Sequence, residues 1–177
     1  MIVLYFRREN MSTEDSHGDK EENMMMIIEK VTSLEQYHLG FLIEDSLSEG
    51  YKFIKRLVDE YKSGSNKFDK KGESLYVAKI DDEIIGIGGL NIDPYLNLSD
   101  VGRVRHLYVL RKNRGTGVGK KLLYTIIDEV RSNFRKIRLS STNNPAAVNL
   151  YIECGFLKVE GIYKASHILE ISKTANE

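Results

Sequence analysis

The feature that most constrains this sequence is a glycine-rich segment, Gly115–Gly119, between a predicted strand and a predicted helix. The strand is expected over Arg103–Leu110, where apolar residues dominate the second half. The helix shows one apolar face at helical spacing, formed by Val118, Leu122, Leu123, Ile126, Ile127 and Val130. Backbone amides at a helix start are unpaired and carry partial positive charge, and glycines leave them open to a ligand. The order strand, glycine turn and helix therefore predicts a site for an anion such as a phosphate or diphosphate.

The glycine spacing excludes two common nucleotide-binding loops. A P-loop requires G-x-x-x-x-G-K-[ST], but a loop ending at Gly119 would begin at Arg114 and would have Lys121 in place of Ser or Thr. The dinucleotide pattern G-x-G-x-x-G fails because Lys120 stands where the third glycine belongs. The alternative that this loop binds no ligand stays open at this point.

Composition indicates one globular domain. The chain has 177 residues, of which 41% are hydrophobic and 29% charged. Its 26 basic and 26 acidic residues balance, so no general affinity for nucleic acid is expected. The longest apolar run, Met1–Phe6, is too short to span a bilayer, so we expect a soluble, cytoplasmic protein without a membrane partner. A single cysteine, Cys154, excludes an internal disulfide and fits a reducing compartment, and no residue cluster has the spacing of a zinc site.

The chain divides into a polar start and a patterned domain. Residues 1–25 are predicted to be a disordered extension, residues 26–173 the folded domain and residues 174–177 a tail. Strands are predicted over 27–31, 74–80, 84–93, 103–110, 137–140, 156–161 and 167–172, and helices over 34–47, 51–61, 118–130 and 145–154. The order β-α-α-β-β-β-α-β-α-β-β predicts an α/β fold with a single mixed sheet.

Two motifs lie in the second half of this domain. The first is Arg114-x-x-Gly117-x-Gly119, which follows the apolar residues Leu107–Val109. The second is Asn144-x-x-Ala147-x-x-Leu150-Tyr151-x-x-x-Gly155-Phe156. With both motifs in this order, the sequence resembles the GNAT acetyltransferase superfamily. The resemblance covers residues 27–172 in element order and residues 107–156 at the level of motifs.

The resemblance implies a GNAT-like domain with splayed central parallel strands. It also implies acetyl-CoA as co-substrate and transfer of its acetyl group to a primary amine by direct attack. The acceptor would be a small molecule or a peptide, and the protein a monomer or homodimer. A second hypothesis is a non-catalytic acetyl-CoA-binding sensor or regulatory domain on the same fold, because fold alone does not decide function.

The resemblance also assigns residues to acetyl-CoA. The backbone amides of Gly115, Thr116, Gly117, Val118 and Gly119 would hold the diphosphate, with Arg114 adding charge. Backbone groups of Tyr108 and Val109, together with the Asn144 side chain and more weakly Asn149, would pair with the pantetheine arm. The amide near Val109 would also donate to the developing oxyanion.

The resemblance suggests a general acid for the transfer but leaves the general base unassigned. Tyr151 matches the tyrosine that would protonate the leaving thiolate, although a tyrosine on an apolar helix face also fits a core position. The base is missing, because arginines occupy positions 103 and 105, where many family members carry a carboxylate or histidine. His106 is a candidate only if a bulge re-aims it, since alternation places it on the face opposite Arg103 and Arg105. Otherwise the proton would leave through water or Asp93.

Arg103 and Arg105 also suggest which class of acceptor the protein uses. Alternation groups Arg103 and Arg105 with Leu107 and Val109 on one strand face, where guanidinium groups would favour an acceptor with a carboxylate or phosphate. Asp93 and Tyr95 would then hold the ammonium end of the acceptor. In the alternative, the arginines pair with acidic neighbours such as Asp100 and line no pocket.

Overall fold

The computed structural model describes residues 2–6, 24–141 and 144–171 of the chain. These residues form one mixed sheet of eight strands in the order β1-β2-β3-β4-β5-β6-β8-β7. The strands are β1 Ile2–Phe6, β2 Met24–Lys30, β3 Ser74–Ile80, β4 Glu83–Ile92, β5 Val101–Val109, β6 Lys136–Leu139, β7 Leu157–Lys158 and β8 His167–Glu170. The helices are α1 Gly40–Ser48, α2 Phe53–Ser63, α3 Val118–Val130 and α4 Pro145–Glu153, with short 3-10 turns η1 Leu34–Gln36 and η2 Arg111–Asn113. The predicted mixed α/β single domain is confirmed.

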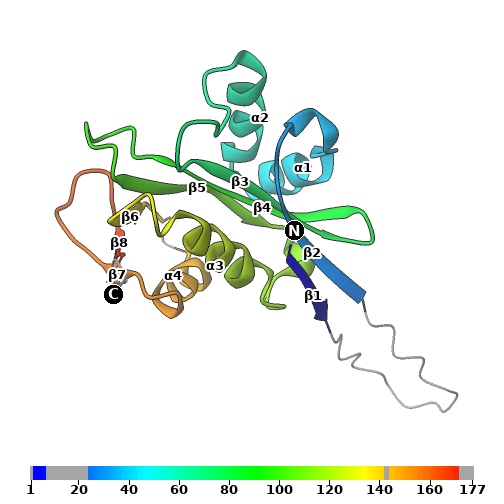
Figure 1. Ribbon diagram of the computed structural model, residues 1–177. Helices are drawn as coiled ribbons and strands as arrows, with labels where there is room; N and C mark the ends of the chain where they lie inside the picture. Colours follow the sequence, from blue (N-terminus) through cyan, green and yellow to red (C-terminus); the bar gives the residue numbers. More distant parts are fainter. Residues whose placement is uncertain (1, 7–23, 142–143, 172–177) are drawn as a thin grey trace, which may run out of the picture.

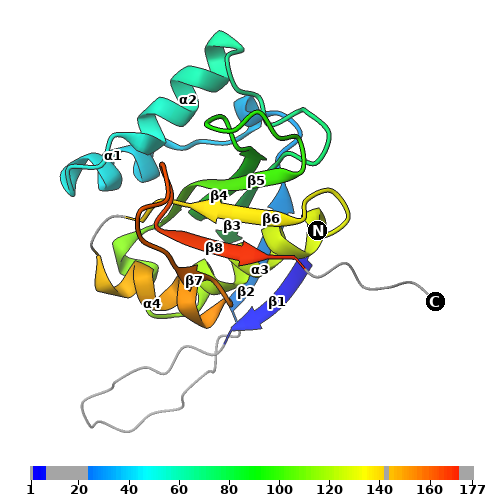
Figure 2. The ribbon, with the colours of Figure 1, turned by 90° about the vertical axis from the view of Figure 1, so that its left-hand side faces the viewer.

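The helices cover the two faces of the sheet. Helices α1 and α2 lie on one face, and α3 and α4 lie on the other (Figures 1 and 2). The apolar stripe predicted for α3 is buried along its whole length. Glycines in β4 let α3 approach closely, because a Cβ atom at Gly86 would lie 3.0 Å from Leu122 and one at Gly88 would lie 3.2 Å from Ile126.

The first predicted helix is interrupted in the structure. The predicted helix over residues 34–47 is in fact η1 followed by α1, which begins at Gly40. Tyr37 between them has an extended backbone with φ −117° and ψ 132°, so the apolar pattern runs across a break. The hairpin between β3 and β4 turns as expected at Asp81 and Asp82, whose positive φ angles of 48° and 65° suit a tight hairpin turn.

The N-terminal segment corrects the prediction of a disordered extension over residues 1–25. Residues 2–6 form β1, which pairs antiparallel with β2 from Ile2↔Ile28 to Phe6↔Met24. Both segments are rich in residues that favour strands, and β2 would otherwise expose a row of unpaired backbone groups. The prediction is therefore wrong for residues 2–6 and for Met24 and Met25 of β2, while residues 1 and 7–23 and the tail 174–177 lie outside the described residues.

The parallel strands β5 and β6 separate along their length. They pair only from Val101↔Lys136 to Arg103↔Arg138, and β6 ends at Leu139. Strand β5 continues to Val109, so in the described part of the chain its second half has no neighbour on this side. The splay that the resemblance implied is therefore present, and a gap opens at the carboxyl ends of both strands.

The close packing at Gly89 yields a stability prediction. A Cβ atom there would lie 2.6 Å from the Phe68 ring and 3.0 Å from the Ser74 carbonyl oxygen. We expect Gly89→Ala to destabilise the protein by roughly 1–3 kcal/mol, the usual cost of overpacking a core. Gly40→Ala is the matched control, because nothing lies within 4 Å of a Cβ atom there. Thermal unfolding of both variants tests this, and equal melting temperatures would contradict the packing argument.

Candidate active site

The glycine loop joins the end of β5 to the start of α3. Gly115 and Gly117 have φ angles of +77° and +84°, which residues with side chains rarely adopt. Gly117 is the N-cap of α3, and the first helical hydrogen bond runs from the Lys121 amide to its carbonyl oxygen at 3.0 Å. The amides of the three residues between them therefore have no carbonyl partner within the helix. The strand, glycine turn and helix that the sequence predicted are present, and anion binding at this loop stays a prediction.

The end of β5 directs a backbone amide into the gap. The Leu110 amide donates to the Ile85 carbonyl of β4 at 2.9 Å. Hydrogen bonding alternates along an antiparallel pair, so the amide and the carbonyl of Val109 point away from β4, to the side where β6 has ended. The Val109 carbonyl accepts a bond of 3.0 Å from Arg114 Nε. Val109 therefore presents its backbone groups to the gap, and their pairing with acetyl-CoA stays a prediction.

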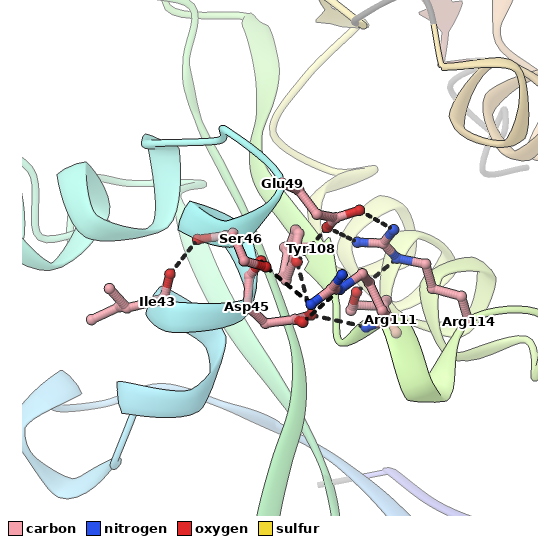
Figure 3. A network of polar contacts seen from close by, with 9 residues as sticks. Ile43, Asp45, Ser46, Glu49, Tyr108, Arg111 and Arg114 are labelled. Atoms are coloured by element: carbon pink, nitrogen blue, oxygen red, sulfur yellow. Dashed lines mark hydrogen bonds and ion pairs between the residues drawn. The ribbon is translucent and has the colours of Figure 1, made fainter.

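Arg114 does not reach into the glycine loop. Its guanidinium binds both carboxylate oxygens of Glu49, the C-cap of α1, at 2.8 and 2.5 Å, and lies 5.2 Å from the centre of the Tyr108 ring. Figure 3 shows Glu49 reaching across from α1 to this guanidinium. The arginine that was expected to add charge for a diphosphate is compensated by a carboxylate in this structure.

A second ion pair lies beside the first. Arg111 Nε donates to Asp45 at 2.8 Å, and the Tyr108 hydroxyl lies 2.9 Å from an Asp45 oxygen and 2.6 Å from a Glu49 oxygen (Figure 3). Hydrogen bonds from Arg114 hold the pKa of Glu49 below its usual value, and burial and the two carboxylates raise the pKa of Tyr108. Together these contacts fix α1 to the segment between β5 and the glycine loop.

Tyr151 lies on α4 with its ring buried. Its ring packs edge-on against Phe156 at 6.0 Å and lies 5.6 Å from the His167 ring. Burial raises the pKa of Tyr151 to about 12, so the phenol stays protonated at neutral pH. Its hydroxyl makes no hydrogen bond to another described residue.

Asn144 and Asn149 occupy different positions on α4. Asn144 is the N-cap, with its side-chain oxygen accepting from the Ala146 amide at 3.0 Å, and Pro145 takes the first helical position as predicted. Among the residues that the structure describes, the Asn144 side-chain amino group has no hydrogen-bond partner. Asn149 is exposed on the helix surface.

A bulge in β5 overturns the expected strand alternation. The pairing with β4 shifts so that two residues, His106 and Leu107, lie opposite Gly88, and His106 has a φ of +57°. Beyond the bulge the faces exchange: Arg105, His106 and Tyr108 contact the α1–α2 side, while Leu107 lies against α3. The prediction that placed Leu107 and Val109 on one face with the two arginines is therefore wrong, because one extra residue shifts the alternation.

The bulge re-aims His106 without exposing it. The ring lies near Phe53 and Phe68 and is 6% exposed, and its Nδ1 lies 2.9 Å from the Phe53 carbonyl oxygen. Burial lowers the pKa of His106 to about 3, and within the described residues its Nε2 has no partner. A neutral imidazole enclosed by aromatic rings is poorly placed to take a proton from a substrate, so the structure argues against the candidate base.

The arginines expected to bind an acidic acceptor are already engaged. Arg103 and Arg138 both bind Asp93, which is fully buried, and Arg105 binds Glu60 of α2 at 3.2 Å. Asp93 is therefore not free to hold an ammonium group or to take a proton. These contacts agree with the alternative in which the arginines pair with acidic neighbours, although the partners are Asp93 and Glu60 and not Asp100.

These buried arginines hold the segment between β7 and β8. Arg103 donates to the Lys164 carbonyl at 2.6 Å, and Arg138 donates to the Tyr163 carbonyl. Tyr95 contacts Tyr163 edge-on at 6.2 Å and is 45% exposed, so it lies at the surface beside this segment. The cluster is structural: it fixes a loop against the face of the sheet that α1 and α2 cover.

Sequence reasoning missed the acidic residues of α1. Asp45 and Glu49 are four positions apart, which places them on one face of a helix. That spacing, opposite a loop containing Arg111 and Arg114, was the available signal.

Comparison with known proteins decides the family. Residues 41–156 match the family model described as Acetyltransferase (GNAT) family. The chain belongs to this family. Acetyl-CoA is the co-substrate of this family. In the part of the chain that the structure describes, no helix is long and apolar enough to cross a membrane.

Individual relatives agree with this membership. Streptothricin acetyltransferase from Escherichia coli is 31% identical over 112 residues, a match that spans 61% of this chain and 62% of the relative. A candidate acetyltransferase from Exiguobacterium sp. 255-15 has a similar structure, with a TM-score of 0.73, 28% identity and coverage of 82% of this chain and 93% of that one. The yncA protein of Salmonella typhimurium, solved with its cofactor acetyl-CoA, shares the fold at a TM-score of 0.63 and 16% identity, over 85% and 96% of the two chains.

The glycine loop supports a binding prediction. We expect Gly117→Val to raise the dissociation constant for acetyl-CoA at least tenfold, because a branched side chain disfavours the left-handed conformation at the start of α3. Gly64→Val is the control: Gly64 has a similar φ of +77° at the end of α2, away from the loop. Calorimetric titration with acetyl-CoA should separate the two variants, and an equal loss of affinity in both would refute the assignment of the loop.

Proposed function

We propose that this protein transfers the acetyl group of acetyl-CoA to a primary amine on a small molecule or peptide, by direct attack of the amine. The observation that carries the proposal is the convergence of three features at one end of the sheet. The gap beyond Leu139 opens there, the Val109 amide points toward it, and the Gly115–Gly119 loop leads into α3, which begins at Val118. The Val109 amide and the amides of this loop would serve as donors to different parts of acetyl-CoA.

Backbone groups would bind the co-substrate. The glycine-loop amides would hold the diphosphate, since unpaired amides at a helix start favour an anion. The Val109 amide and carbonyl would pair with the arm of acetyl-CoA as a missing strand would, and the Asn144 side chain would add a donor. A donor already fixed in a strand needs no reorganisation as charge develops on the acetyl oxygen.

Tyr151 would supply the proton for the leaving sulfur. Its raised pKa keeps the phenol protonated throughout the neutral range. The same desolvation would raise the proton affinity of a thiolate beside it, so that the leaving sulfur would take up the phenol proton. A proton held next to the leaving group is what general acid catalysis requires.

The first acceptor to test follows from the relative named above. That protein acts on streptothricin, so streptothricin heads a panel that also contains amino acids, their decarboxylated amines and a peptide with a free N-terminus. The assay measures free thiol released from acetyl-CoA. Release that depends on one amine class supports transfer, whereas acetyl-CoA binding without release by any amine would favour the non-catalytic alternative.

A tyrosine substitution tests the acid. We expect Tyr151→Phe to lower kcat by roughly 10²-fold, a typical contribution of general acid catalysis, with little change in acetyl-CoA affinity. Tyr76→Phe is the control, because Tyr76 is similarly buried but lies in β3, on the other side of β4 from the gap. A loss of folded protein with normal turnover of the remaining molecules would instead show that Tyr151 is a core residue.

A further inference from the structure

The contacts of Arg114 describe a complete site for a cation. Its guanidinium is held by the Glu49 carboxylate on one side and lies over the Tyr108 ring, as a cation lies over an aromatic face. Figure 3 shows Glu49 at the end of α1, Tyr108 on β5 and Arg114 in the loop that follows, facing one another. Glu49 is 20% exposed and Arg114 is 38% exposed, so the site opens to solvent on the side of the arginine.

We infer that the place now filled by the Arg114 guanidinium is the binding site for the ammonium group of the acceptor, formed by the Glu49 carboxylate and the Tyr108 ring. The inference rests on the proposed function, since it states where the proposed amine binds. The acceptor class is a primary ammonium carried on an apolar stem.

Arg114 blocks the co-substrate where it lies. Its Nε binds the Val109 carbonyl, which points into the gap between β5 and β6. The arm of acetyl-CoA needs that carbonyl, so Arg114 has to leave it when acetyl-CoA binds. Arg114 directly precedes Gly115, and a diphosphate on the glycine-loop amides would attract the released guanidinium.

The departure of Arg114 leaves Glu49 without its cation. The other arginine of the cluster, Arg111, is bound to Asp45 by its Nε and by its backbone amide at 2.9 Å. A partly buried carboxylate that loses its partner is costly, which favours entry of a second cation. The acceptor ammonium is that cation, and it arrives next to the strand end that holds the acetyl group.

The surroundings define the stem of the acceptor. Tyr108 contacts Phe53 edge-on at 5.9 Å, and Phe53 contacts Tyr51 at 5.6 Å. These three rings form an aromatic wall beside the cation site, on the α1–α2 face. An alkyl stem would pack on this wall, while a carboxylate next to the ammonium would meet Glu49 and be repelled.

Binding measurements without turnover test the site. Cadaverine serves as the probe, because it carries primary ammonium groups on an alkyl stem. We expect the native protein to bind cadaverine at least tenfold more tightly when saturated with CoA than without it, because CoA removes Arg114 from the site. Glu49→Gln should abolish this tight binding and should lower the dissociation constant of acetyl-CoA about fivefold, since Arg114 is no longer held by a carboxylate.

Two further variants keep the test decisive. Asp45→Asn is the matched control, because Asp45 also accepts from Tyr108 and pairs with an arginine of the same loop, yet it should change neither constant more than twofold. Arg114→Gln should let cadaverine bind without CoA as tightly as the native protein does with it. Melting temperatures confirm that each variant is folded.

The outcomes separate this inference from the proposed function. Cadaverine affinity that does not depend on CoA, or equal losses in Glu49→Gln and Asp45→Asn, would overturn the assigned site even if acetyl transfer occurs. The expected binding pattern without thiol release from acetyl-CoA would leave the site intact and would refute the transfer.

Discussion

The end of parallel pairing at Arg103 and Arg138 is the constraint on which the site depends. Up to that pair, the backbone amides and carbonyls of β5 and β6 hydrogen-bond to each other. Beyond it, the edge of β5 has backbone groups that need another partner. In this structure the Arg114 side chain provides one of them at the Val109 carbonyl. A strand edge of this kind can accept an extended amide-bearing molecule, and on this basis we propose that the edge binds the arm of acetyl-CoA.

The bulge in β5 and the acidic residues of α1 connect that edge to the acceptor side. By shifting the alternation, the bulge turns Tyr108 toward α1, where its hydroxyl meets Asp45 and Glu49. The strand end, the glycine loop and α1 are thereby linked through two ion pairs. A change at Arg114 on the co-substrate side is consequently felt at Glu49 on the acceptor side. This link explains how one molecule could prepare the site for the other.

The predictions that succeeded rest on local chemistry. The amphipathic α3, the Asn144-Pro145 start of α4 and the glycine turn before Gly117 each depend on neighbours within a few positions. The predictions that failed depend on distant partners. Arg114 and Glu49 are 65 positions apart, Arg103 and Lys164 are 61 apart, and neither pair leaves a periodic trace in the sequence. The N-terminal strand failed for the same reason, because its stability comes from pairing with β2 and not from its own residues.

The sequence by itself determined the order of the elements from β3 onward, the family and the position of the glycine turn, because glycine conformations and helix periodicity act over a few residues. Only the tertiary structure decided which face of β5 each side chain occupies, since a single extra residue at His106 reverses a period of two. It also decided which charges are free. The sequence shows arginines near the site, but only the packed structure shows that Arg103 pairs with Asp93, Arg105 with Glu60 and Arg114 with Glu49. Ion pairing between separate elements requires their positions in space, and no local rule supplies those.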